Sequence, residues 1–189
     1  MPNKTTLIPA PRVLYEVSVR SLELHVGSES LDITSLLENG RASYVIFQHV
    51  VAHLLGLHPG GEGAGPDLID ITGQGYEQKA YADVELHPNE PDEFHTAASS
   101  TFRANNQGPR IKELLSDGNY AGALALCKAT YDKSDYYIYT NTSHYRSAVP
   151  LRFVILPTAD VLTLLSKTDP RLIDRRKILA RVTDTVSLD

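Results

Sequence analysis

The sequence predicts an α/β fold in which a mixed central β-sheet is flanked by α-helices. Residues 42–57 carry apolar side chains at helical spacing, ahead of Pro59. Residues 68–84 read as two short strands joined by a glycine-containing turn at residues 73–75. Residues 151–156, LRFVIL, are almost entirely apolar, which is typical of a strand that is buried on both faces.

The first part of the chain predicts an arm, a strand and a loop around the helix at residues 42–57. Residues 1–12 contain three prolines and predict an extended arm. Residues 13–26 alternate between apolar and polar side chains, which favours one strand or two short elements broken near Ser21. Residues 58–66, HPGGEGAGP, predict a mobile loop that leads the chain to Asp67.

The second part alternates helices and strands. Asp117-Gly118-Asn119 predicts a break that divides a helical segment in two. The expected elements are helices within 107–131, a strand at 135–140, a strand at 151–156, a helix at 159–166 and a basic C-terminal helix over 167–182.

Length and composition limit the broad class of the protein. The 189 residues, 42% of them hydrophobic, predict one domain over residues 1–189. The formal net charge of -5 does not by itself indicate a nucleic-acid-binding protein. It does not exclude one either, because binding depends on where basic groups cluster. A lone cysteine, Cys127, cannot form an internal disulfide and suits a reducing compartment. Without an apolar run of membrane-spanning length, we expect a soluble, cytoplasmic protein.

The chemistry-bearing residues lie in the predicted strand–turn–strand segment. The two-residue period of a strand places Glu77 and Lys79 on one face and Gln78 on the other. If the two strands pair, Asp67 lies near both. Two carboxylates supply the hard oxygen ligands that Mg²⁺ prefers. An adjacent ammonium orients water or stabilises developing charge, so the trio suits Mg²⁺-dependent hydrolysis of a phosphodiester.

These residues resemble the signature of the PD-(D/E)XK nuclease superfamily, which includes most type II restriction endonucleases. Asp67, Glu77 and Lys79 fall on its three signature positions, with nine residues between Asp67 and Glu77. The resemblance implies a restriction-endonuclease-like fold with an αβββαβ core over about residues 42–157. One strand of that core is not obvious in the sequence, and residues 13–26 are a candidate for it.

The resemblance also implies catalytic roles and partners. Asp67 and Glu77 would bind Mg²⁺, the backbone carbonyl of Gln78 would complete the metal shell, and Lys79 would position the attacking water. The substrate would be double-stranded DNA, cut by a homodimer whose two sites act on the two strands. A polar residue on the preceding helix often assists the site, and Gln48, His49 and Glu38 all remain candidates.

A small nuclease without a separate DNA-binding domain must read DNA through loops of its catalytic domain. We expect these contacts from residues 86–107 and 141–150, which are rich in side chains that hydrogen-bond to bases and phosphates. The predicted DNA-binding residues are Ser99, Ser100, Arg103, Asn105, Asn106, Asn141, His144 and Arg146.

Two other functions fit the same sequence. The first is a non-catalytic binding or assembly protein in which the Asp67–Glu77–Lys79 pattern is accidental. The second is a zinc hydrolase built on His49 and His53, which share one helical face at a spacing that can ligate zinc. There is no HExxH motif, because Val50 follows His49.

Overall fold

The computed structural model describes most of the chain. The described residues are 9–18, 23–33, 36, 40–60, 65–81, 89, 91–95, 107–141 and 151–188, with the backbone alone for 40–44. The strands are β1 (Val13–Val17), β2 (Glu23–Val26), β3 (Glu29–Asp32), β4 (His58–Pro59), β5 (Leu68–Ile69), β6 (Gly75–Tyr81), β7 (Glu93–His95), β8 (Tyr136–Asn141), β9 (Leu151–Pro157), β10 (Leu172–Asp174) and β11 (Asp184–Leu188). The helices are α1 (Gly40–Leu55), α3 (Gln107–Ser116), α4 (Tyr120–Tyr131), α5 (Thr158–Leu164) and the short 3₁₀ helices η3 (Arg175–Lys177) and η4 (Leu179–Arg181).

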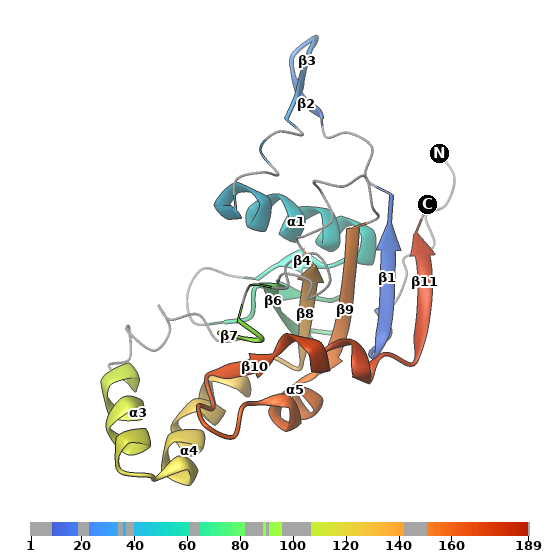
Figure 1. The fold of residues 1–189 in the computed structure, drawn as a ribbon. Helices are drawn as coiled ribbons and strands as arrows, with labels where there is room; N and C mark the ends of the chain where they lie inside the picture. Colours follow the sequence, from blue (N-terminus) through green and yellow to red (C-terminus); the bar gives the residue numbers. More distant parts are fainter. Residues whose placement is uncertain are drawn as a thin grey trace.

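A mixed seven-stranded sheet forms the centre of the molecule, in the order β11-β1-β9-β8-β6-β5-β4 (Figure 1). β1 is parallel to β11 and β6 is parallel to β8, whereas the other neighbouring strands are antiparallel. Two smaller pairs, β2–β3 and β7–β10, lie outside this sheet. The predicted α/β class with a mixed central sheet is therefore confirmed.

Helix α1 covers one face of the sheet. Its buried side chains Phe47, Val51 and Leu55 recur at helical spacing and pack in one core with Tyr15 of β1 and Phe153 of β9. The Tyr15 and Phe153 rings stack across the β1–β9 pair with centroids 5.0 Å apart. α1 thereby fixes the strands that run through the middle of the sheet.

Helices α3, α4 and α5 cover the other face. Cys127 and Tyr131 of α4 pack in a second core with Tyr137 and Tyr139 of β8. The predicted break between α3 and α4 is confirmed, because Gly118 adopts a φ of +71° that favours glycine. Asn119 then caps α4 by accepting a hydrogen bond from the Gly122 backbone N–H at 2.9 Å.

Two predictions about strands need correction. The segment from 58 to 66 is not only a loop, because His58–Pro59 forms β4 and pairs with β5 at the edge of the sheet. The predicted strand at residues 13–26 is two elements, β1 and β2, in agreement with the broken alternative. Only β1 joins the central sheet, where it lies between β9 and β11, whereas β2 pairs with β3 in a separate hairpin (Figure 1).

The prediction of a basic helix over residues 167–182 is wrong. Asp169 and Asp174 each accept a hydrogen bond from the backbone N–H two residues later, at 2.9 and 3.0 Å, which bends the chain into turns. The segment instead forms β10 and the two 3₁₀ helices, and it leads into β11, which pairs with β1. Within the part of the chain that the structure describes, no helix has the length and apolar character needed to span a membrane.

Candidate active site

The β5–β6 hairpin that carries the predicted site is closed by Asp70. Its Oδ1 accepts hydrogen bonds from the Thr72 and Gln74 backbone N–H groups, at 2.8 and 3.0 Å. Gly73 has a φ of +87°, so the turn needs glycine at this position. The turn spans residues 70–74, and Gly75 already belongs to β6, one correction to the predicted turn at residues 73–75.

Pro66 and Asp67 lie against two glycines, Gly60 and Gly75, because a larger residue at either position would collide with Pro66. A Cβ at Gly75 would lie 2.8 Å from Cγ of Pro66, and a Cβ at Gly60 would lie 2.0 Å from the Pro66 carbonyl oxygen. The Gly60 N–H donates to the Asp67 carbonyl oxygen at 2.8 Å. Pro66 therefore packs closely between Gly60, which follows β4, and Gly75 of β6, and this packing fixes the backbone of Asp67.

Glu77 is the buried centre of the site, with a side chain only 5% exposed. Lys79 Nζ lies 2.6 Å from Glu77 Oε1, and Lys133 Nζ lies 2.8 Å from Oε2. A buried carboxylate needs compensating charge, and here one ammonium faces each oxygen. The predicted pairing of Glu77 and Lys79 on one face of β6 is confirmed by this contact.

Asp67 lies against the same stretch of β6. Its Oδ2 accepts a hydrogen bond from the Gln78 backbone N–H at 2.9 Å. The pKa of the Tyr137 hydroxyl is raised, first by burial and by Tyr139 and then by the charges of Glu77 and Asp67. The hydrogen bond to Gln78 places the Asp67 carboxylate beside β6 at the residue that lies between Glu77 and Lys79.

Gln78 turns its side chain away from this cluster. Its Nε2 lies 3.4 Å from Oγ1 of Thr140, on the sheet face that α1 covers, as the two-residue period predicts. In a strand, the N–H and C=O of one residue point to the same edge. Because the Gln78 N–H points to Asp67, its carbonyl group faces the same edge, which is where the predicted metal-binding role requires it.

The donor set fits a hard divalent cation. Asp67 and Glu77 provide carboxylate oxygens, and Gln78 provides a backbone carbonyl on the same edge. Among the described residues, Glu77 Oε2 is buried and accepts no hydrogen bond of good geometry, although Lys133 Nζ is 2.8 Å away. An oxygen held only by an ion pair is a group that a cation can take over.

Lys133 is the member of the cluster that the sequence did not reveal. It follows α4, 54 positions after Lys79 by the numbering of the chain, and no motif links the two. The parallel pairing of β8 with β6, which begins at Tyr136 and Tyr76, brings this segment to the hairpin. Asp135 strengthens that junction, because its Oδ2 accepts the Gly75 N–H at 2.8 Å.

The three candidates on the helix before the signature are placed differently. Gln48 of α1 contacts the site, with Nε2 3.4 Å from the Asp67 carbonyl oxygen. His49 is exposed, and Glu38 lies outside the described residues. Gln48 is therefore the candidate that the geometry favours, through contact with the backbone of Asp67.

The predicted DNA-binding residues lie mostly outside the described part of the chain. This holds for Ser99, Ser100, Arg103, Asn105, Asn106, His144 and Arg146. Asn141 is described and is only 1% exposed at the end of β8. Its contact with DNA stays a prediction that burial disfavours.

The histidines of the zinc alternative show no metal geometry. His49 and His53 are both exposed. Within the described ranges, no group of three or more His, Cys, Asp and Glu side chains is placed to hold a metal, and this applies to Asp67 and Glu77 as well as to the histidines. Nothing in these ranges favours zinc over the carboxylate site.

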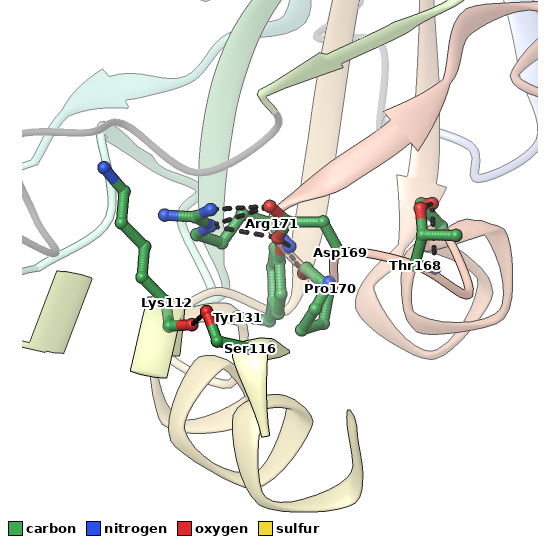
Figure 2. A network of polar contacts seen from close by, with 8 residues as sticks. Lys112, Ser116, Tyr131, Thr168, Asp169, Pro170 and Arg171 are labelled. Carbon is green, nitrogen blue, oxygen red and sulfur yellow. Dashed lines mark hydrogen bonds and ion pairs between the residues drawn. The ribbon is translucent and has the colours of Figure 1, made fainter. Parts of the chain in front are cut away.

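Three basic residues of the C-terminal segment, Arg171, Arg176 and Lys177, are paired with acids. Figure 2 shows Arg171 turned onto Asp169, with Nη2 2.6 Å from Oδ2, beside Tyr131, whose hydroxyl donates to the Pro170 carbonyl oxygen at 2.8 Å. Arg176 pairs with Asp174 at 3.1 Å. Arg171, only 14% exposed, is held in this turn, whereas Arg176 is 55% exposed and its surface ion pair is weak.

Comparisons of the chain with protein-family models, curated proteins and solved structures found no match. The functional argument therefore depends on the geometry of Asp67, Glu77 and Lys79.

Proposed function

We propose that this protein is a Mg²⁺-dependent endonuclease that hydrolyses DNA phosphodiester bonds. Two observations carry the proposal. A 2.9 Å hydrogen bond from the Gln78 N–H holds the Asp67 carboxylate beside β6, and the neighbouring residues Glu77 and Lys79 form an ion pair of 2.6 Å. Two carboxylates and an ammonium are the groups that this reaction needs.

The order of the elements around the hairpin supports the proposal. α1 is followed by β4, β5 and β6, then by β7, which lies outside the central sheet, then by α3 and α4, and then by β8, which is parallel to β6. This order agrees with the αβββαβ core of the PD-(D/E)XK superfamily. For the strand that the sequence left unassigned we propose β4, which lies between α1 and the signature, in place of residues 13–26, whose strand β1 pairs with β9 and β11.

The residues divide the proposed chemistry among them. Asp67, Glu77 and the Gln78 carbonyl would hold Mg²⁺, which when bound lowers the pKa of water and neutralises charge at the phosphate. Lys79, fixed against Glu77 and only 12% exposed, positions the attacking water and stabilises developing charge. Gln48 steadies the Asp67 backbone from α1.

The finer proposal is a site-specific type II restriction enzyme that acts as a homodimer on double-stranded DNA. It is supported by the polar composition of residues 86–107 and 141–150. Repair and junction nucleases share the same signature, so the DNA products must separate these subclasses.

The test is incubation of the protein with unmethylated phage DNA, in Mg²⁺ and in EDTA. Asp67→Asn is the informative variant, because the amide keeps an oxygen for the Gln78 N–H while it removes the charge. Asp117→Asn, on the exposed turn between α3 and α4, is the matched control.

We expect discrete fragments that require Mg²⁺, are lost with Asp67→Asn and persist with Asp117→Asn. Diffuse degradation with the same dependence would retain the nuclease and reject the restriction enzyme. No cleavage of several DNAs would favour a non-catalytic binding protein. Equal cleavage by both variants would reject Asp67 as a member of the active site.

A further inference from the structure

Lys133 contacts the same carboxylate as the signature lysine, from a different part of the chain. Its Nζ lies 2.8 Å from Glu77 Oε2, whereas Lys79 occupies Oε1. The Lys133 side chain is 20% exposed, compared with 12% for Lys79 and 5% for Glu77. Lys133 is therefore the outermost of the three groups and the one that reaches solvent most easily.

The contact of Lys133 is also the weaker of the two. Lys79 Nζ donates a hydrogen bond to Oε1 at 2.6 Å, but Oε2 accepts no hydrogen bond of good geometry among the described groups. An ion pair without hydrogen-bond geometry is held by charge alone. A divalent cation that needs this oxygen competes with Lys133 more readily than with Lys79.

The charges of the site change when a cation enters. Asp67 and Glu77 carry two negative charges and Lys79 and Lys133 two positive charges, so the four side chains sum to zero. With a divalent cation on the carboxylates, the ammonium of Lys133 loses its main attraction to Glu77. A phosphodiester bound at the site, which gains negative charge during hydrolysis, would then be an acceptor for this ammonium.

We propose that Lys133 is a second active-site lysine, which holds Glu77 before cation binding and then binds the DNA phosphate. This inference rests on the proposed nuclease function. It predicts opposite effects on two measurements, because Lys133 opposes cation binding and promotes cleavage. Removal of its charge should strengthen cation binding and slow cleavage. A side chain that only stabilises the fold would affect both measurements in the same direction.

The test compares Lys133→Met, which keeps the length of the side chain without its charge, with Lys128→Met on the exposed face of α4 as control. The first measurement is Mn²⁺ affinity without DNA, by electron paramagnetic resonance. The second is the single-turnover cleavage rate at saturating Mg²⁺. Lys133→Arg, which keeps the charge, and thermal unfolding of each variant control for misfolding.

We expect Lys133→Met to bind Mn²⁺ about 3- to 10-fold more tightly and to cleave about 10- to 100-fold more slowly. Lys133→Arg and Lys128→Met should bind Mn²⁺ like the unchanged protein. Unchanged or weaker Mn²⁺ binding by a folded Lys133→Met protein, or an unchanged cleavage rate, would overturn the role of Lys133. Failure of the unchanged protein to cleave DNA would instead overturn the nuclease function itself.

Discussion

The pairing of Glu77 with two lysines predicts a strongly non-additive effect on stability. Lys79→Met or Lys133→Met alone leaves one ammonium beside the carboxylate, so each single variant should lose only about 1 kcal/mol of unfolding free energy. The double variant leaves a side chain that is 5% exposed with neither ion pair. Removing the partners of a buried charge costs about 3–5 kcal/mol.

An upper bound follows from protonation. A glutamate in water takes up a proton at a cost of about 4 kcal/mol at neutral pH. A buried carboxylate that has lost its counter-ions takes up a proton when burying the charge would cost more free energy than protonation. We therefore expect the double variant to lose about 3–4 kcal/mol, of which about 1–2 kcal/mol is coupling between the two lysines.

Urea denaturation of the unchanged protein, both single variants and the double variant measures this coupling. Lys128→Met serves as control, because Lys128 is exposed on α4, and should be neutral within about 0.5 kcal/mol. Additive losses, with the double variant equal to the sum of the singles, would refute the shared role of the lysines at Glu77.

Three further predictions concern the framework around the site. Gly75→Ala places a Cβ 2.8 Å from the signature proline and should cost about 1–3 kcal/mol by urea denaturation, whereas Gly65→Ala, with open space around its Cβ, should be neutral. Tyr131→Phe removes a buried 2.8 Å hydrogen bond to a backbone carbonyl and should lower the unfolding free energy by about 1 kcal/mol; no change would show that the bond is not formed. The hydrogen bond and charge of Arg12 lower the pKa of Asp160, so this contribution is present at neutral pH and is lost as the pH falls through the lowered pKa. Asp160→Asn should therefore destabilise the protein at neutral pH but not in acid, and an equal loss at both would contradict the ion pair.

Local signals in the sequence predicted much of the fold. Three features depend only on neighbouring residues and can be predicted without the tertiary structure. They are the helical spacing in α1, the break at Asp117–Asn119 and the apolar run of β9. The prediction that Glu77 and Lys79 share one face of β6 is confirmed for the same reason, because the two-residue period of a strand is a local property.

The features that the sequence did not predict depend on distant partners. β4 has two residues, one of them Pro59, which is too short for any periodicity and unfavourable as a strand signal. The sequence of residues 167–182 predicted a helix, but hydrogen bonds from backbone N–H groups to Asp169 and Asp174 stabilise turns there instead. Lys133 reaches Glu77 only because β8 pairs with β6, a long-range contact that no local pattern encodes.

The most direct test of the proposed nuclease site compares single-turnover DNA cleavage by Lys79→Ala and Lys128→Ala in Mg²⁺. Both variants remove one lysine, but only Lys79 lies 2.6 Å from Glu77. We expect Lys79→Ala to cleave roughly 10²- to 10³-fold more slowly than the unchanged protein, which is typical for loss of a group that stabilises transition-state charge, and Lys128→Ala to cleave at the unchanged rate. Equal rates for a folded Lys79→Ala protein and the control would contradict the assignment of Asp67, Glu77 and Lys79 as the active site.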